Sequence, residues 1–159
     1  MFHLKVGDKA PEFDIKDQNG KVHKIADYQG KKVILYFYPK DLTPGCTVQS
    51  CDLRDNYESL IKDGFEVIGV SADDEAKHQK FIAKHDLPFN LLADTDRAVL
   101  NRYGVWGEKK FMGKTYDGIH RTTFIIDENG VIEDIILKVK TKIHTEQIRD
   151  LNLKGKPTV

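Results

Sequence analysis

Several features are scarce in this chain of 159 residues, and each scarcity narrows the possible functions. The longest uninterrupted apolar run covers only the six residues from Val33 to Tyr38, whereas a membrane-spanning helix needs about 20. Lysine and arginine total 25, as do aspartate and glutamate, so no net charge attracts the chain to nucleic acid or anionic lipid. We therefore expect small-molecule and protein partners, and neither a nucleic acid nor a membrane.

The start of the chain also lacks the apolar core of a secretory signal, because residues 1–8 mix apolar with charged and small residues. This composition favours a cytoplasmic protein. In that compartment thiols are kept reduced. The two cysteines, Cys46 and Cys51, are therefore expected to be catalytic, redox-sensing or inert rather than joined in a permanent structural disulfide.

Signs of a metal or cofactor site are missing too. The six histidines show neither an H-E-x-x-H motif nor ligand spacing with the cysteines. The stretch from Gly107 to Thr115 resembles a phosphate-binding loop, but five residues separate Gly107 from Gly113 where that motif has four. We interpret this stretch as an ordinary loop, and we expect no metal and no cofactor.

The order of apolar segments predicts the fold class. The run from Lys32 to Tyr38 and the segment from Glu66 to Ala72 are typical of strands buried on both faces. Helices are predicted from about Pro44 to Asp63, ending at Gly64, and from Asp74 to His85. The other predicted elements are an N-terminal hairpin around Asn19-Gly20, a short strand over 91–93, a short helix before Gly104, strands over 121–126 and 131–137, and a helix over 144–153.

Parallel β-α-β units followed by an antiparallel hairpin and a helix are the order of a thioredoxin-like α/β fold. We therefore expect a mixed central sheet flanked by helices, with the N-terminal β-hairpin at its periphery. The length suits one domain over residues 1–159.

The two cysteines should differ in reactivity. If the helix starts at Pro44, Cys46 lies in its first turn, where free N–H groups and the helix dipole favour a thiolate, and Cys51 lies beyond that zone. Lowering the pKa of a free thiol from about 8.5 to ~6 corresponds to roughly 3.4 kcal/mol. A helix dipole supplies ~2 kcal/mol at best. A cation is therefore expected beside Cys46.

Arg121 is the best candidate for that cation. Arg54 follows Cys46 by eight residues, which places it ~12 Å away along a helix. Arg121 instead opens a predicted antiparallel strand, which would begin where the parallel strands end. That edge of the sheet also carries Cys46.

The spacing of the cysteines adds a constraint. On an ideal helix, residues five apart have Cα atoms ~8.7 Å apart. A disulfide needs about 4.4 to 6.8 Å. Cys46 also shares a helical stripe with Leu53, Tyr57 and Leu60, whereas Cys51 is turned about 140° away. A bond between the two sulfurs therefore requires the first helical turns to unwind.

The stretch from Tyr38 to Thr47 resembles the active-site signature P-x-x-x-T-x-x-C of peroxiredoxins, here formed by Pro39, Thr43 and Cys46. The presence of a second cysteine at position 51 resembles the pattern of the Q-type subfamily, whose members are also called bacterioferritin comigratory proteins. The segment around Arg121 resembles the same subfamily, so the resemblance covers most of the chain.

This resemblance implies a thiol peroxidase that reduces hydrogen peroxide and organic hydroperoxides. Cys46 would attack the peroxide and become a sulfenic acid, and Cys51 would resolve it to an intramolecular disulfide. Thr43 would hydrogen-bond the thiolate and the peroxide, Arg121 would stabilise the thiolate and polarise the peroxide, and Pro39 would shield the site. Thioredoxin would regenerate the dithiol. Resolution within one chain favours a monomer.

Other interpretations stay open at this stage. Cys51 could be incidental on its helix, Arg121 could be an ordinary surface residue, and Thr43 could serve simply as an N-cap. A thiol-disulfide oxidoreductase on the same fold is a second hypothesis, although its cysteines are usually two residues apart. A non-catalytic peroxide sensor is a third.

Overall fold

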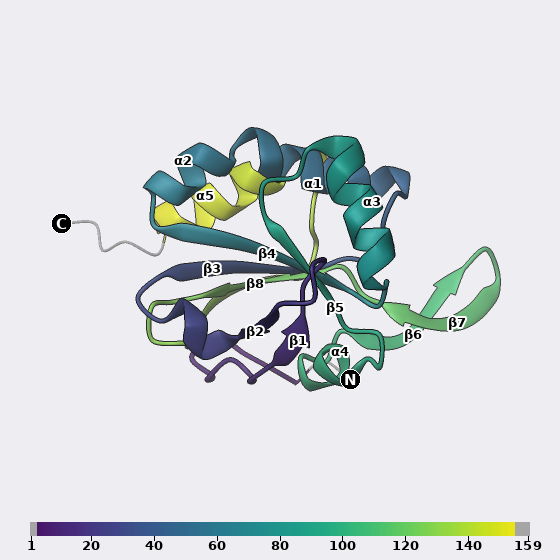
Figure 1. Cartoon of the computed structure of the whole chain (residues 1–159). Helices are drawn as coiled ribbons and strands as arrows, with labels where there is room; N and C mark the ends of the chain where they lie inside the picture. The colour runs from purple at the N-terminus through teal and green to yellow at the C-terminus, as the bar shows by residue number, and fades with distance from the viewer. Residues whose placement is uncertain (1–2, 155–159) are drawn as a thin grey trace.

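A five-stranded mixed β-sheet forms the centre of the computed structural model, which describes residues 3–154 (Figure 1). Its strand order is β5-β4-β3-β8-β9; the first three are parallel and β8 is antiparallel to both of its neighbours, β3 and β9. The strands are β3 (Lys32–Phe37), β4 (Phe65–Ser71), β5 (Asn90–Ala93), β8 (Thr122–Ile126) and β9 (Ile132–Ile136). The predicted thioredoxin-like sheet is confirmed. The described residues leave out Met1, Phe2 and residues 155–159. The predictions for residues 1–8 and for the end of the domain therefore fall partly outside the described residues.

The central strand β3 supplies side chains to both faces of the sheet. Ile34 and Tyr36 pack on one face, together with Tyr38 just after the strand, and Val33, Leu35 and Phe37 pack on the other. Strand residues alternate between faces, so a strand covered on both sides must be apolar at nearly every position. This is the physical reason for the continuous apolar run in the sequence.

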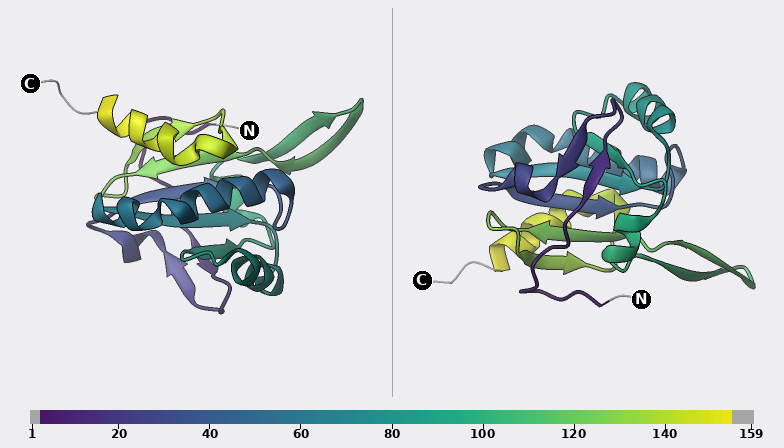
Figure 2. Two further views of the ribbon diagram at one scale, coloured as in Figure 1. Left: turned by 90° about the horizontal axis from the view of Figure 1, so that it is seen from above. Right: turned by 60° about the horizontal axis from the view of Figure 1, so that its bottom comes forward.

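Helices cover one face, and a mixture of short elements covers the other (Figures 1 and 2). The helical face carries α1 (Pro44–Asp55), α2 (Tyr57–Lys62), α3 (Glu75–His85) and α5 (His144–Lys154), the last preceded by the 3-10 turn η2 (Thr141–Ile143). The opposite face carries the hairpin β1 (Asp14–Lys16) and β2 (Val22–Lys24), the 3-10 turn η1 (Ile25–Tyr28) and α4 (Ala98–Arg102). Within residues 3–154, no helix has the length and apolar character needed to cross a bilayer.

The predicted helix over 44–63 is wrong in one respect, because it is two helices separated at Asn56. The backbone of Asn56 has φ −110° and ψ 6°, and its side-chain amide donates to the carbonyl of Asp52 at 2.8 Å. Asparagine side chains compete in this way with helical backbone bonds. The predicted end of the second helix is confirmed: Gly64 has φ +89° and follows α2 directly after Asp63.

The interpretation of residues 107–115 as a loop is also wrong. They belong to a hairpin of β6 (Trp106–Phe111) and β7 (Lys114–Ile119), which projects from the body of the molecule (Figure 2). Met112 and Gly113 form its turn, with φ of +52° and +79°, as in the two-residue turns that suit hairpins. Most side chains of both strands are exposed, so the period-two apolar pattern is absent.

Candidate active site

Cys46 lies where β3 gives way to α1. Thr43 occupies the N-cap position and Pro44 the first helical position, which places Cys46 in the first turn as predicted. The side chain is buried, with 1% exposure, and belongs to the same apolar cluster as Leu53 and Leu60. The predicted stripe on the sheet-facing side of the helix is therefore confirmed.

Arg121 lies directly against this thiol. The strand β8 is antiparallel to β3, and Thr122 pairs with Phe37, so the residue before β8 comes next to the end of β3. Arg121 Nη2 donates to Cys46 Sγ at 3.4 Å. A Cβ atom on Gly45 would stand 3.3 Å from the same Nη2, so the glycine leaves room for the guanidinium. The cation expected beside Cys46 is present.

Cys51 has different surroundings although it is on the same helix. Its side chain is half-buried, and both cysteines are free thiols. Since α1 runs without interruption from Pro44 to Asp55, helix geometry puts the two Cα atoms ~8.7 Å apart, beyond the reach of a disulfide. The helix must open before the sulfurs can bond.

Thr43 and Pro39 lie on the loop that leads to Cys46. Thr43 holds the predicted N-cap position, but its hydroxyl donates to the carbonyl of Lys40 at 2.8 Å and makes no capping bond to α1. Its oxygen lone pairs stay available to accept a hydrogen bond. Pro39 is half-buried and lines a hollow of about 350 Å³ beside the β6–β7 hairpin, and Cys46 is not part of that lining.

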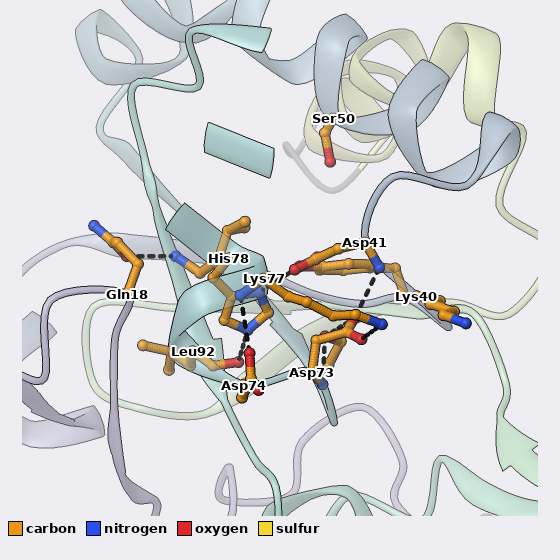
Figure 3. A network of polar contacts seen from close by, with 12 residues as sticks. Gln18, Lys40, Asp41, Ser50, Asp73, Asp74, Lys77, His78 and Leu92 are labelled. Carbon is orange, nitrogen blue, oxygen red and sulfur yellow. Dashed lines mark hydrogen bonds and ion pairs between the residues drawn. The ribbon is translucent and has the colours of Figure 1, made fainter. Parts of the chain in front are cut away.

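A buried polar network anchors this loop (Figure 3). The carboxylate of Asp41 accepts a hydrogen bond from the Tyr38 hydroxyl at 2.5 Å and lies 2.5 Å from His78 Nδ1. His78 Nε2 lies 2.9 Å from the carbonyl of Leu92, and the backbone N–H of Asp41 donates to Asp73. The side chains of Asp41 and His78 are both fully buried. The segment before Cys46 is thereby fixed to α3 and β5.

Two further polar side chains reach the site, Gln49 from α1 itself and Lys109 from β6, which the sequence did not connect to it. Arg121 Nη1 donates to Gln49 Oε1, one turn after Cys46. Lys109, on β6, donates from Nζ to the carbonyl of Ile119 at 2.8 Å. Burial lowers the pKa of Lys109; the charge of Arg121 acts in the same direction, and Cys46 acts against it.

Sequence reasoning missed Asp41, His78, Gln49 and Lys109. Asp41 stands inside the motif stretch, and Gln49 lies on the helical face of Cys46, so these two offered a weak signal. The partner of Asp41 is 37 residues away, and Lys109 lies in the hairpin that was interpreted as a loop. Within residues 3–154, no three side chains of the His, Cys, Asp or Glu type gather as metal ligands.

The arrangement suits thiolate chemistry. The guanidinium of Arg121 and the first turn of α1 both face the sulfur of Cys46, a setting in which positive charge can stabilise negative charge on a cysteine nucleophile. A second thiol on the same helix can form a disulfide with the oxidised first one after local unwinding.

Comparison with known proteins gives consistent matches. Residues 6–135 match the AhpC/TSA family. The chain is 51% identical over 148 residues to peroxiredoxin Bcp of Escherichia coli strain K12, a match that covers 93% of this chain and 95% of the relative. It is 46% identical over 144 residues to peroxiredoxin Bcp of Bacillus subtilis strain 168, covering 91% of this chain and 92% of that protein.

Solved structures show the same likeness. Peroxiredoxin Q of Xanthomonas campestris superimposes with a TM-score of 0.83 at 32% identity, covering 91% of this chain and 92% of that one. A cysteine-to-serine mutant of PrxQ from Xylella fastidiosa gives a TM-score of 0.90 at 27% identity, covering 98% of this chain and 100% of that chain.

Proposed function

Because the chain belongs to the AhpC/TSA family, and within it to the Q-type peroxiredoxins, we propose that Cys46 is the peroxide-attacking thiol and Cys51 the resolving thiol of this thiol peroxidase. The single observation that carries the assignment is the guanidinium of Arg121, 3.4 Å from the buried sulfur of Cys46. Only one of the two thiols has a cation at hydrogen-bond distance within the described part of the chain.

In the first step, the thiolate of Cys46 attacks the nearer peroxide oxygen. The O–O bond breaks, the sulfur becomes a sulfenic acid, and the departing oxygen takes up a proton to leave as water or an alcohol. Arg121 holds the thiolate and stabilises negative charge that develops on the peroxide. Thr43 accepts a hydrogen bond from the peroxide with its free lone pairs, while its own O–H continues to donate to the carbonyl of Lys40.

In the second step, the sulfur of Cys51 attacks the sulfenic sulfur and releases water, which forms the Cys46–Cys51 disulfide. For this the first turns of α1 must unwind, and the contact of Gln49 with Arg121 must open because Gln49 lies between the two cysteines. A dithiol of the thioredoxin type then reduces the disulfide, so that two thiols and one hydroperoxide give a disulfide, an alcohol and water.

The family implies a hydroperoxide substrate and a thioredoxin-type reductant. The bacterioferritin comigratory protein of Xanthomonas campestris, 31% identical, is described by its alkyl peroxide reduction activity, which supports organic hydroperoxides as substrates here. Pro39 is proposed to shield the site from water, from its place in the loop before Thr43. Resolution within one chain needs no second subunit, so we propose a monomer that acts in the cytoplasm, without a cofactor.

The test is to mix the reduced protein with one equivalent of hydrogen peroxide and to follow peroxide loss and intact mass. We expect rapid consumption of peroxide and a mass decrease of two hydrogen atoms, without dimer formation. Unreacted thiols after minutes would contradict the proposal. A thiol-disulfide oxidoreductase is not favoured, because four residues between the cysteines prevent a bond while the helix stands.

A further inference from the structure

A chain of buried polar side chains continues behind Arg121. Gln49 accepts from Arg121 with its Oε1 atom, and its Nε2 atom lies 3.3 Å from His144 Nδ1. His144 Nε2 in turn lies 2.9 Å from the hydroxyl of Thr123. Gln49, Thr123 and His144 have no exposed surface. This series of hydrogen-bonded side chains thus joins α1, β8 and the first residue of α5.

The direction of every hydrogen bond in this chain follows from Arg121. A guanidinium has only donors, so the atom of Gln49 that faces it must be the oxygen. The amide nitrogen of Gln49 then points to His144 as a donor, and Nδ1 of His144 must accept. The ring hydrogen is therefore on Nε2, which donates to Thr123.

The charge state of His144 agrees with this direction. Burial, and secondly the positive charge of Arg121, lower the pKa of His144 to about 3. The ring is neutral at working pH, and Nδ1 keeps the lone pair that Gln49 needs. An amide that turned over would place its nitrogen against the guanidinium, so that buried donors would face each other without an acceptor.

We propose that His144 is a positioning residue of the peroxidase, which fixes the amide of Gln49 so that its oxygen holds Arg121 against Cys46. The proposal rests on the role of Arg121 given above. His144 acts through Gln49 and not on the sulfur: its ring nitrogens are bonded to Gln49 and Thr123. A residue far along the chain, at the start of α5, thus sets the geometry of the cation that activates Cys46.

The test compares two substitutions of His144 in peroxide reduction. His144→Leu removes the acceptor for Gln49, and we expect kcat/KM for hydrogen peroxide to fall about tenfold because the guanidinium loses its fixed position. In His144→Asn the side-chain oxygen can take the place of Nδ1, so most of the rate should return. If His144→Leu does not fold, His144→Gln takes its place, because its longer side chain offers no acceptor at the Nδ1 position.

A double-mutant cycle with Arg121→Gln separates positioning from a purely structural role. If His144 acts through Arg121, His144→Leu should cause no further loss in the Arg121→Gln background. An equal loss in both backgrounds would overturn the proposal, as would an unchanged rate in His144→Leu alone. An Arg121→Gln protein with full activity would instead overturn the function proposed for Arg121.

His23 offers a matched control. It is also a buried histidine with both ring nitrogens bonded, to Tyr28 and Asp17 at 2.6 Å each, but it lies on the N-terminal hairpin. His23→Leu should lower stability and leave kcat/KM unchanged. A comparable fall in kcat/KM for His23→Leu would assign the effect of His144→Leu to general destabilisation and overturn the proposal.

Discussion

The two turns of α1 that carry Cys46 and Cys51 place the same chemical group in two different environments. The first thiol is buried at the helix start, with Arg121 at 3.4 Å, and the polar chain of Gln49 and His144 lies behind that cation. The second is half-buried on the same regular helix. The difference teaches that position on a helix, together with one cation from a distant strand, gives two identical thiols different surroundings, and the roles proposed for them rest on that difference.

Exchanging each sulfur in turn should break the comparison most completely. Cys46→Ser should abolish peroxide reduction, because serine cannot replace a thiolate as the nucleophile here. Cys51→Ser should allow one turnover that ends in a sulfenic acid on Cys46. The measurement is peroxide consumption together with dimedone labelling and intact mass. Retained turnover in Cys46→Ser would reverse the roles of the two thiols.

Removing the cation should make the two environments more alike. Arg121→Gln keeps a polar side chain of moderate length but deletes the charge that faces Cys46. We expect the second-order rate with hydrogen peroxide to fall about 100-fold, in the range found when one transition-state donor is removed. Stopped-flow peroxide reduction measures it. The exposed Arg102 is a control of the same type, and Arg102→Gln should react at the original rate.

Lowering the pH should reduce the free energy of unfolding through His144, which lies behind the Cys46 side of α1. The folded-state pKa of His144 is about 3, against an ordinary value of 6.5, so between these values the unfolded chain binds a proton that the folded chain does not. This contribution to stability is complete above pH 6.5 and is lost as the pH falls, by about 2 kcal/mol between pH 7 and pH 5.

Urea unfolding at both pH values measures this loss. His144→Asn cannot titrate, so its stability should decline by about 2 kcal/mol less than that of the original chain over the same interval. Equal declines in the two proteins would show that His144 is not the group responsible.

The smallest expected change in rate concerns Lys109. Its charge acts on Cys46 as well as on Arg121, so removing it sharpens the comparison of the two thiols. Lys109→Gln should slow peroxide reduction about threefold at neutral pH, since a half-exposed charge is worth less than about 1 kcal/mol. Lys110 is the next residue on the same strand and is exposed, so Lys110→Gln is the matched control and should have no effect. Equal rates in the two variants would contradict a role for Lys109.

Much of the fold could be predicted from the sequence because its strong signals are local. The apolar run of β3, the Pro44 start of α1 and the Gly64 end of α2 each follow from the periodicity or backbone preference of a few residues. The errors occurred where local signals were weak. Asn56 interrupts a helix through its own side chain, and the exposed β6–β7 hairpin has no apolar alternation, although Met112-Gly113 is a plausible turn.

The site divides in the same way. By itself, the sequence determined that a thiol lies at a helix start, that a second thiol lies five residues later, and that a cation must come from elsewhere, with Arg121 as the best candidate. Only the tertiary structure decided that this guanidinium reaches the sulfur and that Gln49, His144 and Thr123 form a series of polar contacts behind it. Spacing and helix geometry are local properties, whereas these partners meet because α5 and β8 pack against α1 across gaps of up to 95 residues.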